Sequence, residues 1–282
     1  MKLDVDEFIS WKHKSITLLG MSGVGKTFLS TLLRKNDWFH YSGDYRIGTR
    51  YLNEAILDNI KLQAMQVPFL RDLLRSDSIY IENNITVDHL KPVSTYLGKL
   101  GNVEKGGLPL KEYKKRQAQH RQAEIAAMLD VPDFIGKAQS IYGFNHFIND
   151  AGGSVCELED DSVMKLLAEH TLILYIKASK ADEEMLIERA KTAPKPMYYR
   201  PDFLDKLLAE YMQENNQPYA SMIDPDSFVL WSFPKLFYSR IPRYDAIAKK
   251  YGYSVSTEEL FQVKTETDFV ELVAEAIRRN KD

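Results

Sequence analysis

Runs of apolar residues mark five candidate strands along the chain. Ser15–Leu19 and Thr171–Ile176 are short, uninterrupted apolar runs, which is typical of strands buried on both faces of a parallel sheet. Trp38–Gly43, Asn145–Asn149 and Tyr253–Val255 are shorter candidates of the same kind. The pattern therefore predicts an α/β chain with a mostly parallel central sheet.

The residues between these strands show helical periodicity or break it. Helices are predicted at residues 28–33, 47–65, 68–74, 113–129, 157–169, 185–191, 202–213, 245–251 and 268–279. Strands that alternate with helices predict a three-layer fold, with helices on both faces of the sheet. We expect one domain over residues 1–282, with a helical insertion at 66–143. Residues 180–237 are expected to form a lid and a lid-adjacent insertion, ending in a polar, aromatic link.

A glycine-rich stretch follows the first candidate strand. Gly20-Met21-Ser22-Gly23-Val24-Gly25-Lys26-Thr27 satisfies G-x-x-x-x-G-K-[ST] between a strand and a helix, and we call it the phosphate loop. Glycines let successive backbone N–H groups point at an anion above a helix N-terminus. Lys26 would reach the β- and γ-phosphates and the Thr27 hydroxyl would hold Mg²⁺. The stretch predicts ATP and Mg²⁺ as cofactors and a P-loop NTPase fold.

Two acids follow candidate strands at the edge where open parallel sheets bind ligands. Asp44 comes after the second strand and Asp150 after the third. With the phosphate loop upstream, Asp150 is expected to hold Mg²⁺ together with Thr27. Either acid could instead serve as a helix cap, and Asp150 also as a turn residue.

Composition narrows the setting and the partners. The chain of 282 residues has a net charge of −3, so it has no global attraction to nucleic acid or to anionic membranes. Residues 111–121 carry five basic side chains against Glu112, which fits a solvated helix face or an electrostatic guide for a charged substrate. Cys156 is the single cysteine, so a reducing, cytoplasmic location is expected. No apolar run approaches the ~20 residues of a membrane helix.

The order of these motifs resembles that of the P-loop small-molecule kinases, most like the shikimate kinases. Residues 39–47 are similar to the family's F-x-D-x-D-x-x-I, which places Asp44 beside the acceptor hydroxyl. Asp150-Ala151-Gly152-Gly153-Ser154 resembles the family's T-G-G-G turn. The resemblance implies that Gly152 and Gly153 line the acceptor pocket with backbone N–H groups.

Two further motifs of the resemblance lie later in the chain. Glu188-Arg189 and Lys195-Pro196-Met197 resemble the lid pattern E-R…R-P-L, which implies that Arg189 and Lys195 act on the transferring phosphoryl group. Residues 240–248 match R-x-P-x-Y-x-x-I-A, whose arginine, here Arg240, contacts the acceptor's carboxylate in shikimate kinases. From the residues alone, Arg240 could equally pair with a surface carboxylate, and the lid cations could be ordinary exposed residues.

The chain departs from the family pattern in three ways. Ser42 replaces the first Asp of the D-x-D pair, and Lys195 replaces an arginine that could clamp phosphate with two hydrogen bonds. The insertions enlarge the acceptor side, so an acceptor larger than shikimate or different from it is implied. We therefore expect ATP-dependent phosphoryl transfer to the hydroxyl of a small, anionic molecule. There are two alternatives: an ATPase coupled to a protein or nucleic-acid partner, and a nucleotide-binding regulatory module.

Overall fold

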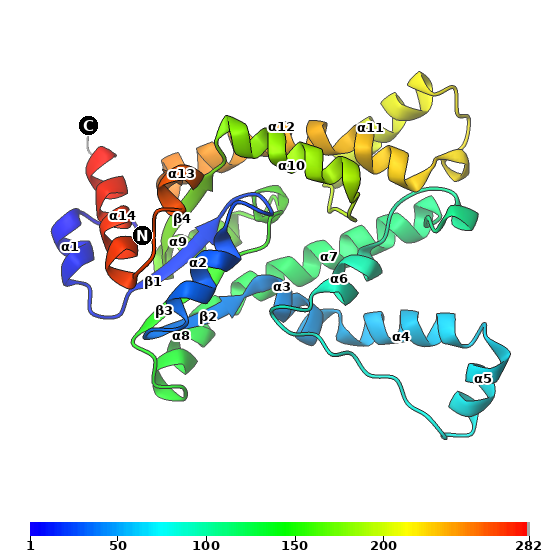
Figure 1. Cartoon of the computed structure of the whole chain (residues 1–282), viewed down its shortest axis with the longest axis horizontal. Coiled ribbons are helices and arrows are strands. Elements are labelled where there is room, and N and C mark those ends of the chain that lie inside the picture. Colours follow the sequence, from blue (N-terminus) through cyan, green and yellow to red (C-terminus); the bar gives the residue numbers. More distant parts are fainter. Residues whose placement is uncertain (281–282) are drawn as a thin grey trace.

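The computed structural model describes residues 1–280, and a five-stranded parallel sheet lies at its centre (Figure 1). The strands are β1 (Ser15–Leu19), β2 (Trp38–Ser42), β3 (His146–Asp150), β4 (Leu172–Lys177) and β5 (Gly252–Ser256). Their order in the sheet is β2-β3-β1-β4-β5, and every neighbouring pair is parallel. All five predicted strands are confirmed.

Helices connect the strands. Between β1 and β3 lie α2 (Lys26–Leu33), α3 (Gly43–Arg46), a π-helical segment (Ile47–Tyr51), α4 (Asn53–Ala64), α5 (Pro68–Arg75), α6 (Lys91–Leu97), a 3₁₀ turn (Val103–Lys105), α7 (Leu110–Leu129) and α8 (Val131–Ser140). The remaining elements are α1 (Val5–Ser10), a 3₁₀ turn at Val155–Glu157, α9 (Asp161–His170), α10 (Lys180–Thr192), α11 (Pro201–Glu214), a 3₁₀ turn at Ala220–Met222, α12 (Pro225–Tyr251), α13 (Thr257–Leu260) and α14 (Glu266–Arg279).

Alternate side chains of β2 show that helices cover both faces of the sheet. The Trp38 ring packs edge-on against Phe269 of α14 at 5.5 Å between centroids. On the other face, the Tyr41 hydroxyl donates a hydrogen bond to the backbone oxygen of Ala127 in α7 at 2.5 Å. Because successive side chains of a strand point to opposite faces, α14 and α7 lie in separate layers. The chain therefore has a three-layer α/β fold around a parallel sheet, with inserted helical segments.

Helix α12 replaces the expected aromatic link. It runs for 27 residues, and residues 245–251 are only its last two turns. Pro234 and Pro242 lie inside it, and because proline removes a backbone donor and usually ends or kinks a helix, the sequence argues against a continuous one. Phe228, Leu236 and Phe237 of this helix are buried, so tertiary packing offsets the cost of the prolines. The predicted link is therefore wrong.

Two stretches that look separate in the sequence share a second hydrophobic core. It is formed by Leu100, Tyr113, Tyr199, Leu204, Leu207, Leu208, Tyr211, Ile223, Phe228 and Leu236. These residues come from the region around α7, from α11 and from α12, and α11 lies away from the sheet (Figure 1). The other half of α7 buries Ala123, Ala127 and Met128 in the main core. Helix α7 thus joins both cores, while the limits of the insertions stay predictions.

Two residues of the basic run on α7, Arg116 and Arg121, form hydrogen bonds with other parts of the chain. Arg116 is buried, and its guanidinium donates to the Tyr96 backbone oxygen at 2.7 Å and to Asn59 Oδ1 at 2.8 Å. Arg121 donates to the backbone oxygen of Leu158 at 2.9 Å. A fully solvated helix face is therefore wrong for these two residues.

Among the described helices, none is long and apolar enough to cross a membrane.

Candidate functional site

The phosphate loop joins β1 to α2 with a backbone that only glycine adopts readily. Gly20 has φ +146°, and a Cβ there would lie 2.8 Å from the backbone oxygen of Ile176. Gly25 has φ +98° and precedes the first residue of α2. Since side chains at these positions would clash or strain the chain, the residues around them are held in a tight turn at the helix N-terminus, where anions bind.

Lys26 begins α2, and its side chain folds back over this turn. Its side chain is buried, and Nζ donates to the backbone oxygens of Gly20 at 2.8 Å and Met21 at 3.0 Å. Burial lowers the pKa of Lys26, while the nearby carboxylates of Asp150 and Asp44 oppose that change. A buried ammonium group curled over a loop of N–H donors fits a polyphosphate chain.

Thr27 and Asp150 meet beside the loop. The Thr27 hydroxyl donates to Asp150 Oδ2 at 2.7 Å, and His40 Nε2 lies 3.7 Å from the same oxygen. Among residues 1–280, no group of three or more His, Cys, Asp or Glu side chains is arranged around a metal position. One hydroxyl and one carboxylate fit Mg²⁺, because this ion usually keeps waters and phosphate oxygens as its other ligands.

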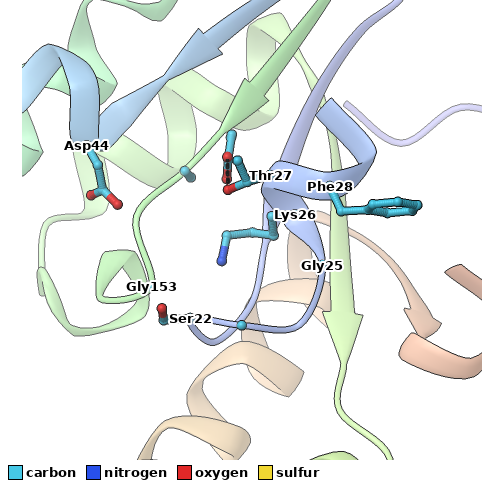
Figure 2. Close-up of a pocket in the computed structure, with 10 residues that line it drawn as sticks. Ser22, Gly25, Lys26, Thr27, Phe28, Asp44 and Gly153 are labelled. Atoms are coloured by element: carbon cyan, nitrogen blue, oxygen red, sulfur yellow. Dashed lines mark hydrogen bonds between the residues drawn. The ribbon is translucent and has the colours of Figure 1, made fainter. Parts of the chain in front are cut away.

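Asp44 faces Lys26 across a cavity of about 290 Å³. In Figure 2 the two side chains point toward one another, and the labelled Phe28 ring points away. The cavity is lined by Ser22, Gly23, Gly25, Lys26, Thr27, Phe28, Asp44, Asp150, Ala151 and Gly153. Burial and the Asp150 carboxylate raise the pKa of Asp44 to about 6, against the effect of Lys26. The side chain that caps α3 is Ser42, which accepts from Tyr45 N at 3.3 Å, so the capping alternative for Asp44 is wrong.

The turn after β3 passes close to these groups. A Cβ on Gly152 would lie 2.3 Å from Glu124 Oε1 and 3.3 Å from Asp44 Oδ1. A Cβ on Gly153 would lie 3.0 Å from Ser22 N in the phosphate loop. Neither position has room for a side chain without a shift of its neighbours. The turn therefore brings backbone between the phosphate loop and two carboxylates.

Arg240 lies beside this turn but is already engaged. Its Nη1 donates to the Gly153 backbone oxygen at 3.0 Å, and Nη2 donates to the Tyr198 backbone oxygen at 2.8 Å and to Glu157 Oε2 at 3.3 Å. Both Arg240 and Glu157 are buried. The expected alternative, an ion pair with a surface carboxylate, is therefore wrong, because the carboxylate is an interior one.

Arg189 and Lys195, the cations expected on the lid, and the nearby Arg200 occupy three different environments. Arg189 of α10 is exposed, and its guanidinium covers the phosphate loop, since a Cβ on Gly23 would lie 2.6 Å from Arg189 Nη2. Arg200 lies 3.6 Å from Glu157 Oε1 and 3.7 Å from Glu159 Oε1. Lys195 is exposed and makes no hydrogen bond or ion pair within the described part of the chain.

Helix α10 is anchored next to the phosphate loop. Ser179 and Asp182 form a capping box at the start of α10, and Thr257 donates a hydrogen bond to Asp182. Leu186, the buried residue of α10, packs against the loop, since a Cβ on Gly23 would lie 2.7 Å from its Cδ2. The hydrogen bond between Thr257 and Asp182 and the packing of Leu186 therefore hold Arg189 above the phosphate loop.

Sequence reasoning missed Glu124 of α7. This side chain is fully buried and accepts from the Ser154 hydroxyl at 2.6 Å. Burial raises its pKa to about 7, and the nearby Asp44 carboxylate adds to the effect, whereas Ser154 opposes it. Gln117, His120 and Glu124 lie at helical spacing on the buried face of α7, but their polar side chains carry no mark of burial in the sequence alone.

Comparisons with known proteins add little to this picture. No protein-family model and no curated protein matches the sequence. Two of the solved structures that match are shikimate kinases of low sequence identity. Shikimate kinase from Bacteroides thetaiotaomicron is 16% identical, with 94% of this chain and 95% of that chain covered and a TM-score of 0.41. Shikimate kinase from Acinetobacter baumannii in complex with shikimate is 13% identical, with 98% of each chain covered and a TM-score of 0.41. Neither likeness is close enough to bear on activity.

Proposed function

We propose that this protein transfers the γ-phosphoryl group of ATP to a hydroxyl group of a small molecule. The observation that carries the proposal is the cavity in which Asp44 faces Lys26 beside the Thr27–Asp150 pair. Phosphoryl transfer requires positioning and charge neutralisation more than covalent catalysis. A carboxylate opposite the phosphate-binding lysine is suited to orient an acceptor hydroxyl and take its proton.

Each residue of the phosphate side has a role in this proposal. Backbone N–H groups of residues 20–27 and the Lys26 ammonium bind the phosphates, and the Thr27 and Asp150 oxygens bind the cation. Mg²⁺, when bound, neutralises charge on the phosphate oxygens. Arg189 already lies over Gly23, where its guanidinium can contact the transferring group. Lys195 would have to approach from its exposed position.

The acceptor side is proposed to lie at the turn after β3. Gly152, Gly153 and Asp44 border it, and Arg240 stands behind Gly153. The family resemblance implies an anionic acceptor through Arg240, but the pairing of Arg240 with Glu157 leaves less positive charge for an anion. We therefore limit this proposal to a hydroxyl acceptor.

Acceptor-dependent release of ADP from Mg·ATP tests the proposal. Wild-type protein is assayed with panels of hydroxylated acids, polyols, amino sugars and nucleosides, alongside Lys26→Ala and Asp44→Asn. We expect turnover that requires one acceptor class and that both variants lose. Equal ADP release without any acceptor would indicate a hydrolase instead. Tight ATP binding without turnover in every panel would indicate a regulatory module.

A further inference from the structure

Behind the Gly152–Gly153 turn lies a group of interior polar side chains that we call the buried polar cluster: His120, Glu124, Glu157, Tyr198 and Arg240. They come from α7, the 3₁₀ turn at Val155–Glu157, the segment between α10 and α11, and α12. His120 Nε2 lies 3.8 Å from Glu124 Oε2, and the His120 and Tyr198 rings are 5.7 Å apart. Elements far apart in the sequence thus bring five polar side chains together.

Several polar atoms of this cluster have no hydrogen-bond partner in the described chain. They are His120 Nδ1, Glu124 Oε1, Glu157 Oε1, Tyr198 Oη and Arg240 Nε. Buried polar atoms are nearly always paired in folded proteins, because an unpaired one loses its hydration without compensation. These five atoms leave hydrogen-bonding capacity that the polar groups of a ligand could satisfy.

Glu124 shows which charge the ligand can carry. Its carboxylate is fully buried, and its only hydrogen-bond donor in the described chain is the Ser154 hydroxyl. His120, the one basic side chain within 4 Å, is neutral near physiological pH, because burial lowers its pKa to about 4. A buried carboxylate without a cation is costly, so hydrogen-bond donors or a positive charge from a ligand would relieve it.

The arginines of the region do not favour an anion. Arg240 uses both terminal nitrogens on Gly153, Tyr198 and Glu157. Arg200 lies against Glu157 and Glu159. Glu157 therefore stands between two guanidinium groups, and Glu124 and Asp44 remain without an arginine partner among residues 1–280. Like charges in a desolvated site repel, so a carboxylate or phosphate on the acceptor would face two acids, and Lys26, the cation that acts on Asp44, is turned toward the phosphate loop.

We infer that the acceptor is a neutral or cationic molecule rich in hydrogen-bond donors, such as a polyol or an amino sugar, rather than a hydroxy acid. Its hydroxyl or ammonium groups donate to Glu124 and Glu157 in the buried polar cluster. Another hydroxyl lies at Asp44, because Asp44 Oδ1 and Glu124 Oε1 lie on the same side of Gly152, 3.3 Å and 2.3 Å from the position of a Cβ there. This inference rests on the proposed function and specifies the substrate class of the same site.

Three six-carbon compounds that differ in charge test the inference: sorbitol (neutral), glucosamine (cationic) and gluconate (anionic). Each is titrated into the wild-type full chain with Mg·ADP, and the shift in melting temperature is recorded together with acceptor-dependent ADP release from Mg·ATP. The variant is Glu124→Gln, which removes the charge and keeps the shape. Glu112→Gln on the same helix is the matched control, because Glu112 pairs with Arg116 near the surface.

We expect sorbitol or glucosamine, and not gluconate, to raise the melting temperature of wild type and of Glu112→Gln. Glu124→Gln should weaken that binding at least about tenfold, because a site built to bind a donor loses affinity when its acceptor is altered. Gluconate as the tightest ligand, equal binding by Glu124→Gln, or no shift with all three compounds would each overturn the inference. If ADP itself does not bind, the proposed function fails, and the shifts without nucleotide still decide the acceptor class.

Discussion

The phosphate side and the acceptor side of the cavity are both polar and largely buried, yet they differ in how their side chains are satisfied. Lys26 Nζ has two backbone partners, and Thr27 is bonded to Asp150. Among residues 1–280, Glu124, Glu157 and Tyr198 across the Gly152–Gly153 turn each keep a polar atom without a hydrogen-bond partner, and on the phosphate side the His40 imidazole beside Asp150 is the exception. Under the proposed function, the phosphate side is organised by the chain itself, whereas the acceptor side would be completed by its ligand.

The two sides also differ in where their residues come from. The phosphate loop is eight consecutive residues, and Asp150 joins it from the neighbouring strand β3. The acceptor side is assembled from α7, α12 and the segment between α10 and α11. Local sequence therefore specifies one side, and packing between distant elements specifies the other.

The largest expected effect is on the phosphate side. Replacing Lys26 with alanine removes the ammonium group that faces the phosphates, and we expect kcat/KM for transfer to fall by about 10³-fold or more. Steady-state kinetics with Mg·ATP and calorimetric titration of Mg·ATP measure the loss. Lys35→Ala, in the exposed turn after α2, should leave both quantities unchanged. A Lys26→Ala rate within tenfold of wild type would refute the assigned role.

Asp44→Asn should separate the two sides. Asparagine keeps the size of the side chain but cannot accept the hydroxyl proton, so we expect kcat to fall by about 10²- to 10³-fold. Affinity for Mg·ATP should stay within about threefold, because the phosphate loop is untouched. Asp58→Asn, on the exposed surface of α4, serves as the control. Full activity of Asp44→Asn with the true acceptor would show that Asp44 is not the base.

Glu124→Gln should stabilise the fold at the same time as it weakens acceptor binding. The pKa of Glu124 is raised from 4.5 to about 7, so between these values the folded state binds a proton that the unfolded state has released. Stability of wild type therefore falls as pH rises through this window. We expect Glu124→Gln to gain on the order of 2 kcal/mol above about pH 8 and little below about pH 4.

Urea unfolding of both proteins across this pH range measures the gain. Glu112→Gln supplies a control of opposite sign, because the hydrogen bond from Arg116 lowers the pKa of Glu112. That variant should lose a small amount of stability at neutral pH. Equal stability of Glu124→Gln and wild type at every pH would mean that the buried carboxylate carries no cost.

The smallest effect is the pH dependence of transfer itself. Asp44, with a pKa of about 6, must be ionised to accept a proton, so the rate should rise about tenfold between about pH 5 and pH 7. Lys26, Asp150 and Glu124 face Asp44 and shape this titration. Initial rates across the range in wild type and Asp44→Asn test it, since the variant should lack this rise.

Much of the fold followed from the sequence because its signals are local. Each strand is a short apolar run, and the phosphate loop is contiguous, so both were predictable. Helix α12 was not, because Pro234 and Pro242 are helix breakers whose cost is offset by distant packing. Which helix of the 66–143 region would lie against the sheet was likewise set by tertiary contacts.

The candidate site divides in the same way. Thr27, Asp44, Asp150 and Lys26 converge as the motifs suggested, although their chemical roles stay predictions. Glu124 was missed because a single glutamate in a charged helix resembles a surface residue until its burial is known. For Arg240, sequence matching gave the position, but only the structure shows its partner, Glu157.

Helix α7 has a consequence for how acceptor preference can change. Its 20 residues extend about 30 Å, and Tyr113 in the second hydrophobic core lies about 17 Å along the helix from Glu124 beside the site. Gln117, midway along it, holds the backbone of Met197 and Tyr199 at 3.1 Å and 2.9 Å. A substitution in the second hydrophobic core can therefore change the tilt of α7 and reposition both Glu124 and the segment that contains Tyr198. Substitutions far from the site can thus change which acceptor is preferred, while the phosphate loop and its neighbours keep their structure.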